Sequence, residues 1–403
     1  MSFAEIEHQD HAVRSLQQAI GRQRIPHAYV FHGPDGVGKE KVAMGLAQIM
    51  LCAEPLTVDL PGDRAAALGV DRLRTGCGRC EDCRSVLAGS HPDLHLIYRQ
   101  LNRKHPEEKV RKRKGLEILI DVVRHFVVAR VGHTAVRGQA KVFIVREADR
   151  MNEEAQNALL KTLEEPQGAT VIVLLVTSLD RLLPTTLSRC QVVRFDALPT
   201  EFVRRKVAEL RPDRPADQLD WNARYADGSV GAAVQNVDDD LYNLNASLSD
   251  GFLALCGAAG RERPAAGNRT TGSAAGETAN PAAWIEASKT LGERYRKLDP
   301  DITDTEAGRR GLRAIFRLAA TWYADLLRCV SGETAGLVNV GAKAMLERAA
   351  VAADRSDLIG AINRIAQAEH HLDLNANTQL VVETLLNDLA STSRRRLAPS
   401  PAV

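Results

Sequence analysis

The chain has 403 residues, of which 44% are hydrophobic and 26% are charged, a composition typical of folded globular proteins that excludes a wholly disordered chain. At roughly 150 residues per domain, this length predicts two or three domains. The 53 Lys and Arg residues nearly balance the 51 Asp and Glu residues, for a net charge of +2. Any contact with nucleic acid must therefore come from a local patch.

No segment has the pattern of a membrane anchor. The longest apolar run, residues 171–176, is far shorter than the roughly 20 residues that a membrane-spanning helix needs. The first ten residues, MSFAEIEHQD, are acidic and lack the basic and then apolar pattern of a signal peptide. We therefore expect a cytoplasmic protein without a membrane partner.

Strands and helices alternate along the N-terminal half. Four short apolar runs predict strands, at 28–31 (AYVF), 141–145 (KVFIV), 171–176 (VIVLLV) and 191–195 (QVVRF). Helical patterns lie between them, at 42–51, 118–128 and 152–165. The fully apolar, β-branched strands are typical of a parallel sheet that is covered on both faces. This order predicts a doubly wound α/β domain over residues 1–196.

The strand signal disappears after residue 198. Residues 200–235 predict two or three short helices, and residues 283–392 have helical apolar spacing throughout. Between them, residues 257–282 are rich in Gly, Ala, Ser and Thr, which predicts a disordered linker or loop. We expect a loose tail at 393–403.

A glycine-rich loop follows the first predicted strand. Residues 33–39 (GPDGVGK) match the phosphate-loop pattern G-x-x-x-x-G-K, in which backbone amides and the lysine hold phosphates and the next residue, Ser or Thr, binds Mg²⁺. The candidate phosphate ligands are Gly33, Gly36, Gly38 and Lys39, and the next residue is Glu40. A carboxylate can ligate Mg²⁺ but also repels a polyphosphate. Two states stay open: the loop binds ATP without turnover, or it binds no nucleotide.

The second acidic element of such a site should follow the strand 141–145 as an Asp-Glu pair, with Asp on the metal and Glu on the attacking water. The sequence has Arg146 and Glu147 there. The alternative interpretation is that Arg146 is simply a solvated arginine at the end of a strand. Because two independent metal positions are altered, we do not expect hydrolysis.

Three closely spaced cysteines indicate a metal site. In a reducing compartment Cys77, Cys80 and Cys83 are better read as thiolate ligands than as disulfide partners. Tetrahedral Zn²⁺ takes four ligands, and two residues could complete the set, Cys52 and His91. We favour Cys52, because the residues between it and Cys77 can loop out and return; the alternative is that Cys52 is a small buried core residue. Four thiolates would leave no open position, so the predicted role of Zn²⁺ is structural.

Several segments together resemble one family. They are PHAYVFHGPDGVGK, the four cysteines, GSHPDLHLI, NALLKTLEEP and LLPTTLSRC. This set is similar to the clamp-loader subunits of bacterial DNA polymerase III, which are AAA+ proteins, over about residues 1–235. The resemblance implies an AAA+ core at 1–196 with a zinc-binding insertion at about 52–83, then a helical lid at 197–245 and a helical collar domain at 283–392.

Two subunit types of this family are similar to the chain, the ATP-hydrolysing τ/γ subunit and the stator subunit δ′. Family ATPases carry Lys-Thr in the loop, Asp-Glu after the strand and an arginine in a G-S-x-R lid motif. This chain has Glu40, Arg146 and Gly231 at those points. Because all three departures fall on the hydrolysis machinery, the pattern resembles δ′ and implies a chain without intrinsic ATPase activity. A τ/γ-type motor is the alternative.

The Ser188-Arg189-Cys190 motif is retained. In the family this arginine is a finger inserted into the ATP site of a neighbouring subunit, and the resemblance implies that catalytic role in trans for Arg189. The other interpretation is a surface arginine that caps the preceding helix. Thr177 matches the position that senses the γ-phosphate in active relatives; alternatively it caps the following helix.

The resemblance also implies partners: τ/γ and δ subunits in a hetero-oligomeric ring at the replisome, primer–template DNA reached through the complex, and the sliding clamp indirectly. The basic run 109–114 (KVRKRK) is either a solvated loop, which we favour, or a contact with the DNA backbone. A stand-alone zinc-ribbon nucleic-acid binder is a third hypothesis, and the α/β core and the SRC motif count against it.

Overall fold

The computed structural model describes residues 3–113, 117–137, 140–256 and 280–397. The chain divides into two compact units, of which the first contains the residues up to 199 together with 228–231, and the second contains 200–227 and the residues from 232 onward. Each unit is considered by itself below. The lid and collar boundaries expected from the sequence stay predictions.

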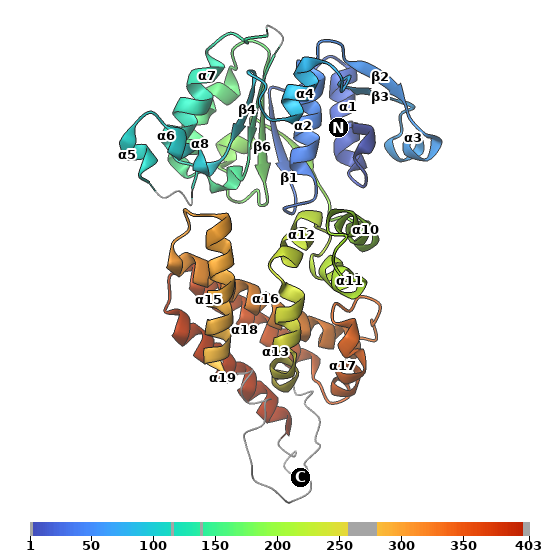
Figure 1. Ribbon diagram of the computed structural model, residues 1–403, viewed down its shortest axis with the longest axis vertical. Coiled ribbons are helices and arrows are strands. Elements are labelled where there is room, and N and C mark those ends of the chain that lie inside the picture. Colours follow the sequence, from blue (N-terminus) through green and yellow to red (C-terminus); the bar gives the residue numbers. More distant parts are fainter. Residues whose placement is uncertain (1–2, 114–116, 138–139, 257–279, 398–403) are drawn as a thin grey trace, which may run out of the picture. The chain divides into compact units, whose positions relative to one another are not determined.

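The first unit is built on a five-stranded sheet with the strand order β4-β5-β6-β1-β7 (Figure 1). Its strands are β1 (Ala28–His32), β4 (Leu94–Ile97), β5 (Lys141–Val145), β6 (Thr170–Val176) and β7 (Gln191–Arg194). Every neighbouring pair is parallel. The carboxyl ends of all five strands therefore share one edge, and the predicted parallel α/β sheet is confirmed.

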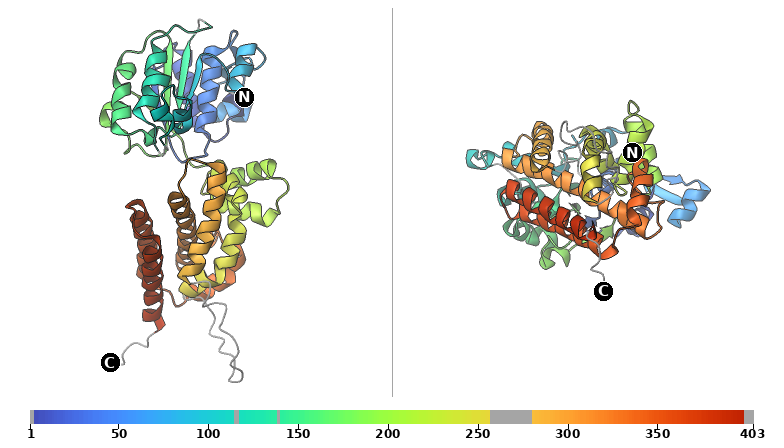
Figure 2. Two further views of the ribbon diagram at one scale, coloured as in Figure 1. Left: turned by 60° about the vertical axis from the view of Figure 1, so that its left-hand side comes forward. Right: turned by 90° about the horizontal axis from the view of Figure 1, so that it is seen from below.

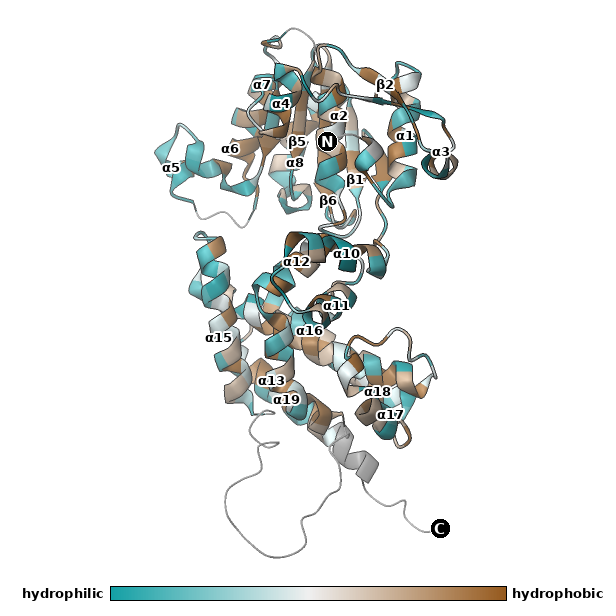
Figure 3. Cartoon of the chain, turned by 45° about the vertical axis from the view of Figure 1, so that its right-hand side comes forward, coloured by the Kyte–Doolittle hydropathy of each residue, from teal (hydrophilic) through white to brown (hydrophobic). Residues whose placement is uncertain are grey.

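Helices cover both faces of this sheet (Figures 1 and 2). One face carries α1 (Asp10–Gly21), α2 (Lys39–Leu51) and α4 (Glu81–Leu87), and the other carries α6 (Ile120–Val123), α7 (Ala129–Val131) and α8 (Glu153–Glu164). All residues of β5 and β6 are buried, and in Figure 3 β5 is coloured as hydrophobic. Because both faces are covered, these strands have no polar side, which explains why every residue after the first, Lys141 or Thr170, is apolar.

Alternate residues of β6 supply the core on the side of α6 and α8. Ile172, Leu174 and Val176 belong to one buried cluster with Leu159 of α8 and Val122 of α6. The helix predicted at 118–128 is not a single α-helix. It consists of α6, a π-helical turn at Arg124–Val128 and then α7.

The stretch after α2 holds elements that the sequence did not predict. They are the antiparallel strands β2 (Leu56–Asp59) and β3 (Arg72–Thr75), with α3 (Gly62–Leu68) between them. The edge strand β4 was also missed. These strands have only four residues each and are partly exposed. Unlike the equally short β7, they contain no pair of adjacent valines, so their apolar signal does not stand out from loop sequence.

The basic region 99–113 is helical over much of its length. It forms a 3-10 helix at Arg99–Lys104 and the short helix α5 (Glu108–Arg111). Leu101 and Val110 are buried, so one apolar side chain from each helix anchors an otherwise hydrophilic segment, which Figure 3 shows at α5.

Beyond residue 199 the described chain is helical. Its α-helices are α10 (Thr200–Leu210), α11 (Ala216–Tyr225), α12 (Val230–Asp238), α13 (Leu241–Leu255), α15 (Pro281–Leu298), α16 (Asp304–Val330), α17 (Lys343–Ala350), α18 (Arg355–Asp373) and α19 (Thr378–Leu397). The predictions of a linker at 257–282 and a loose tail at 393–403 fall largely on 257–279 and 398–403, which lie outside the described residues. Where these segments are described the predictions are wrong, because residues 281–282 begin α15 and residues 393–397 end α19. None of the described helices is both long and apolar enough to cross a membrane.

A buried polar network lies inside the second unit. The fully buried carboxylate of Asp325 accepts hydrogen bonds from the backbone amides of Val338 and Asn339, and the Asn339 side chain accepts one from the indole of Trp221. A buried carboxylate without hydrogen-bond donors would be costly. The loop after α16 supplies these donors, and the bonds hold it against the helices.

Candidate phosphate loop and metal centre

The glycine-rich loop lies between β1 and α2, at the carboxyl edge of the sheet. Gly38 caps α2 with a φ of 104°, a backbone conformation that a residue with a side chain rarely adopts. Lys39 is buried, and its Nζ donates to the carbonyl oxygens of Gly33 and Pro34 at 2.5 and 2.6 Å. Burial lowers the pKa of Lys39, against the opposing charge of Asp35. The loop is therefore folded around its own lysine.

The two altered metal positions contact each other. Glu40, in the first turn of α2, and Arg146, directly after β5, form an ion pair between Oε1 and Nη2. Both side chains are about two-fifths exposed, at 42% and 39%. The Arg146 guanidinium also lies 6.0 Å from the ring centre of Tyr98. The residues that would hold Mg²⁺ in an ATPase are thus engaged with one another.

The expected water-activating residue is held by cations. Glu147 has a left-handed backbone with a φ of 48°. Its carboxylate lies 2.9 Å from the Nε of Arg150 and 3.4 Å from the Nε of Arg99. Both guanidinium groups would have to release this carboxylate before it could accept a hydrogen bond from an attacking water.

Thr177 follows β6 at the same edge. Its hydroxyl donates to Asp149 Oδ2 at 2.5 Å, and its backbone amide donates to the same atom at 3.2 Å. The alternative that Thr177 caps the next helix is wrong, because α9 (Pro184–Leu187) begins seven residues later with Leu183 as its N-cap. Asp149 was not singled out from the sequence, since it lies in a short 3-10 turn without a recognisable motif.

The segment 228–231 packs onto the loop, backbone against backbone. Ser229 Oγ donates to the carbonyl of Asp35 at 2.6 Å, and the Gly231 amide donates to the carbonyl of Gly36 at 3.1 Å. A Cβ on Gly231 would lie 2.7 Å from the Cα of Gly36. Glycine at 231 therefore does more than lack the arginine of the G-S-x-R motif: it permits this close contact.

Arg189 lies at the opposite edge of the sheet. It precedes β7 by two residues, and because β7 runs parallel to β1, the start of β7 is far along the strand direction from the loop that follows β1. Its side chain is 32% exposed. The guanidinium donates to Glu164 of α8 and to the carbonyl of Thr185. The Arg189 side chain is therefore partly exposed and is already hydrogen-bonded within the chain.

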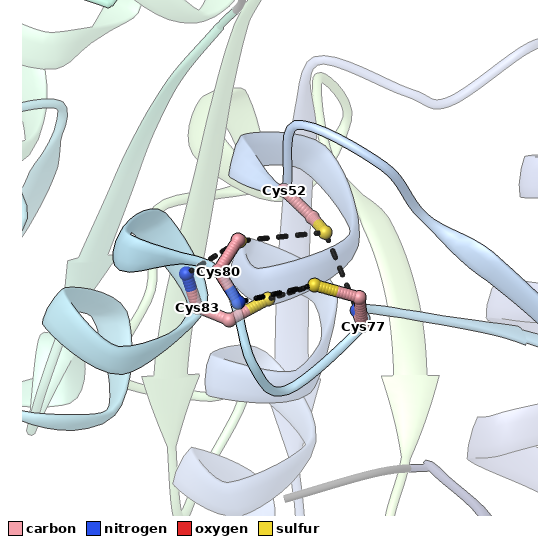
Figure 4. A group of neighbouring side chains, drawn as sticks. All are labelled: Cys52, Cys77, Cys80 and Cys83. Carbon is pink, nitrogen blue, oxygen red and sulfur yellow. Dashed lines mark hydrogen bonds between the residues drawn. The ribbon is translucent and has the colours of Figure 1, made fainter.

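Four sulfurs come together at the end of α2 (Figure 4). The Sγ atoms of Cys52, Cys77, Cys80 and Cys83 all lie within 4.8 Å of one another. The Cys52–Cys80 and Cys77–Cys83 pairs are each 3.9 Å apart. Thiolates at about 2.3 Å from a tetrahedral Zn²⁺ are about 3.8 Å apart, so the residues present fit this ion. The four cysteines could hold a metal ion.

Backbone amides donate to three of the four sulfurs, whereas burial raises the pKa of the Cys52 and Cys83 thiols. The amides of Cys77, Cys80 and Cys83 donate to the sulfurs of Cys52, Cys77 and Cys80 at 3.2 to 3.3 Å. The amide of Cys80 is the largest cause that lowers the pKa of Cys77 to about 6. His91, the other candidate ligand, stands apart: its Nδ1 accepts from the Asp93 amide and its Nε2 faces Asp82.

The basic run keeps its charges engaged where it is described. Lys109 pairs with Glu107 at 2.9 Å and Lys112 pairs with Glu108 at 2.7 Å, all four on the surface. These local pairs favour a solvated surface segment over a DNA contact, although residues 109–111 belong to α5 and not to a loop. Lys114, the end of the run, lies outside the described residues.

Comparison with known proteins identifies the N-terminal part. Residues 8–199 match the family described as "DNA polymerase III, delta subunit". The Pseudomonas aeruginosa DNA polymerase III subunit delta' is 37% identical over 245 residues, which are 59% of this chain and 66% of that protein. The chain is a relative of DNA polymerase III subunit delta'. It spans just under two thirds of this relative.

The τ/γ type is also related. The Escherichia coli DNA polymerase III subunit tau is 29% identical over 62% of this chain and 34% of its own length. Among solved structures, a γ-subunit-related protein of DNA polymerase III from Thermotoga maritima covers 95% of this chain at 18% identity, with a TM-score of 0.40. At that score the likeness carries no argument about the fold.

Proposed function

We propose that this chain is a δ′-type stator of the DNA polymerase III clamp loader, an AAA+ subunit that does not hydrolyse ATP and donates Arg189 to the ATP site of a neighbouring subunit. The observation that carries the proposal is the ion pair between Glu40 and Arg146. The two residues at the expected metal-binding positions bind each other in this pair.

Other contacts at the carboxyl edge support the absence of hydrolysis. Glu147 lies between Arg99 and Arg150 instead of facing a water position, and the hydroxyl of Thr177 is bound to Asp149. The G-S-x-R arginine, which contacts the γ-phosphate in active family members, is replaced by Gly231. A τ/γ-type motor would need positions 40, 146 and 231 restored and the contacts of Glu147 and Thr177 released.

The retained Arg189 supports a role in trans. A chain that lacks its own metal ligands has no internal use for an arginine finger, and Arg189 lies at the other edge of the sheet from its own phosphate loop. Its exposure and its planar set of five donors suit it to the phosphate oxygens of a second subunit. Such a finger stabilises charge on the transferring phosphoryl group.

The proposed setting follows from the same role. The partners are τ/γ and δ subunits in a hetero-oligomeric ring in the cytoplasm, at the replisome. Primer–template DNA is reached through the complex and the sliding clamp indirectly. The four cysteines hold a structural Zn²⁺, which fastens the insertion with β2 and β3 to the end of α2.

Reconstitution tests the proposal. Full-length chain is combined with τ/γ and δ subunits, and DNA-stimulated ATPase and clamp-loading rates are measured for the wild type, Arg189→Ala, Arg189→Lys and the control Arg181→Ala, an exposed arginine of the same connection. Arg189→Ala should lower the rate at least about tenfold, Lys should rescue it only partly, and Arg181→Ala should be neutral.

Two results would overturn this function. One is a normal loading rate for Arg189→Ala in an assembled complex. The other is ATP turnover by the isolated chain that disappears in Lys39→Ala, which would return the protein to the motor class.

A further inference from the structure

A catalytic nucleotide site of the family implied by the sequence carries Mg²⁺ between the first turn of α2 and the end of β5. The residues present do not fit this ion. Position 40 has a carboxylate in place of a hydroxyl, and position 146 has a guanidinium in place of a carboxylate. Hard divalent cations take oxygen ligands, and one of the two expected oxygen donors is a fixed positive charge.

The two misfits are complementary. Glu40 and Arg146 are 106 residues apart in the chain, and their side chains form an ion pair across the space between α2 and β5. The pair joins the same two elements that a shared metal ion would join. Either residue alone would leave an uncompensated charge beside the loop, whereas the negative charge of Glu40 and the positive charge of Arg146 neutralise each other.

The other charged groups around the loop are also engaged. Lys39 is bound to loop carbonyls, Asp35 accepts the amide of Gly36 at 3.0 Å, and Asp149 accepts from Thr177. A divalent cation entering here would have to break the Glu40–Arg146 pair and then stand beside the Arg146 guanidinium, which like-charge repulsion opposes. The backbone amides of the loop are unaffected by either substitution.

We propose that the Glu40–Arg146 pair is an internal replacement for Mg²⁺: it holds α2 against β5 without a ligand and makes the phosphate loop reject metal-bound nucleotides. Any nucleoside diphosphate or triphosphate that the loop accepts is metal-free. This selectivity belongs to the isolated chain and goes beyond the proposed stator role, so it can fail while that role stands.

The test measures ATP and ADP binding to the full-length chain by calorimetry, with EDTA and with Mg²⁺. For the wild type, Mg²⁺ should give no gain in affinity. The double variant Glu40→Thr/Arg146→Asp restores a hydroxyl and a carboxylate, and Mg²⁺ should raise its ATP affinity about tenfold or more. A matched control, Glu201→Thr/Arg204→Asp, alters an exposed Glu–Arg pair of α10 and should show no response to Mg²⁺.

The proposal is overturned if Mg²⁺ strengthens nucleotide binding to the wild type, or if the folded double variant shows no response to the metal. Thermal melting supplies a second measurement that does not need nucleotide. The reversed pair Glu40→Arg/Arg146→Glu should melt above both of its single variants, because opposite charges again face each other. Melting of the reversed pair at or below the single variants would show that the two side chains do not act as a pair.

Discussion

Arg189 is joined to Glu164, the last residue of α8, by a hydrogen bond of 2.6 Å from its Nε to the Glu164 Oε1. Both side chains are partly exposed, at 32% and 46%, and such pairs contribute only about 0 to 1 kcal/mol. The guanidinium is therefore oriented by Glu164 but can exchange this carboxylate for a phosphate at little cost. If Arg189 acts in trans as proposed, this ion pair orients its guanidinium and contributes little to the stability of the fold.

Replacing Glu164 should impair the positioning of Arg189. Glu164→Gln keeps the size of the side chain and removes its charge, so we expect a reconstituted ATPase rate about two- to fivefold lower and an unfolding free energy changed by less than about 0.5 kcal/mol. In the Arg189→Ala background the same change should have no further effect, since residues that act through one contact are not additive. Additive losses in ATPase rate would show that Glu164 acts separately.

Removal of the metal should destabilise the first unit. We expect one Zn²⁺ per chain by elemental analysis, and its loss to a chelator should lower the unfolding free energy by about 3 kcal/mol or more, because metal binding to such a site is coupled to folding. Cys52→Ser should lose most of the zinc, whereas His91→Gln and Cys329→Ser should keep it. Full zinc retention in Cys52→Ser would remove that residue from the ligand set.

A methyl group at position 231 should disturb the loop. In Gly231→Ala the new Cβ would approach the Cα of Gly36 to 2.7 Å, a backbone overlap that neither side can relieve by a rotamer change. We expect a loss of about 1 to 3 kcal/mol in urea unfolding. Gly308→Ala, inside α16 with nothing within 4 Å of the added Cβ, should instead stabilise by up to about 1 kcal/mol. Equal effects of the two substitutions would contradict the close contact.

Stability should fall in mild acid because of His95. Burial, with Arg130 as the next cause, lowers its pKa to about 4 from the usual 6.5, and its ring stacks on Phe143 with centroids 4.5 Å apart. Between those two pH values the unfolded chain binds a proton that the folded chain does not, so the unfolding free energy decreases as the pH drops from 6.5 toward 4 and changes no further below it.

His95→Gln isolates this effect. Glutamine does not titrate, so the difference in unfolding free energy between wild type and variant should shift by on the order of 1 kcal/mol between pH 7.5 and pH 5, after allowance for solvent screening of the partly exposed ring. Other titrating groups, the cysteines included, cancel in this difference. A difference that does not depend on pH would show that His95 titrates normally in the folded state.

The sequence by itself determined the features whose signals are local. The strands β5 and β6 were predictable because continuous burial demands continuous apolar residues, and the phosphate loop because its glycines and Lys39 lie within seven residues. The spacing of Cys77, Cys80 and Cys83 indicated a metal centre for the same reason. The short strands β2, β3 and β4 escaped, since four partly exposed residues carry too little pattern.

Only the tertiary structure decided which distant residues meet. The sequence showed Glu40 and Arg146 as two separate departures from an ATPase, and the parallel order β5-β6-β1 brings them to one edge, where they pair. It favoured Cys52 over His91 as the fourth ligand, and the return of the chain after β3 places the sulfur, not the imidazole, beside the other three. Such pairings depend on strand order and on the path of the connections, which fix positions across more than a hundred residues and leave no periodic trace along the chain.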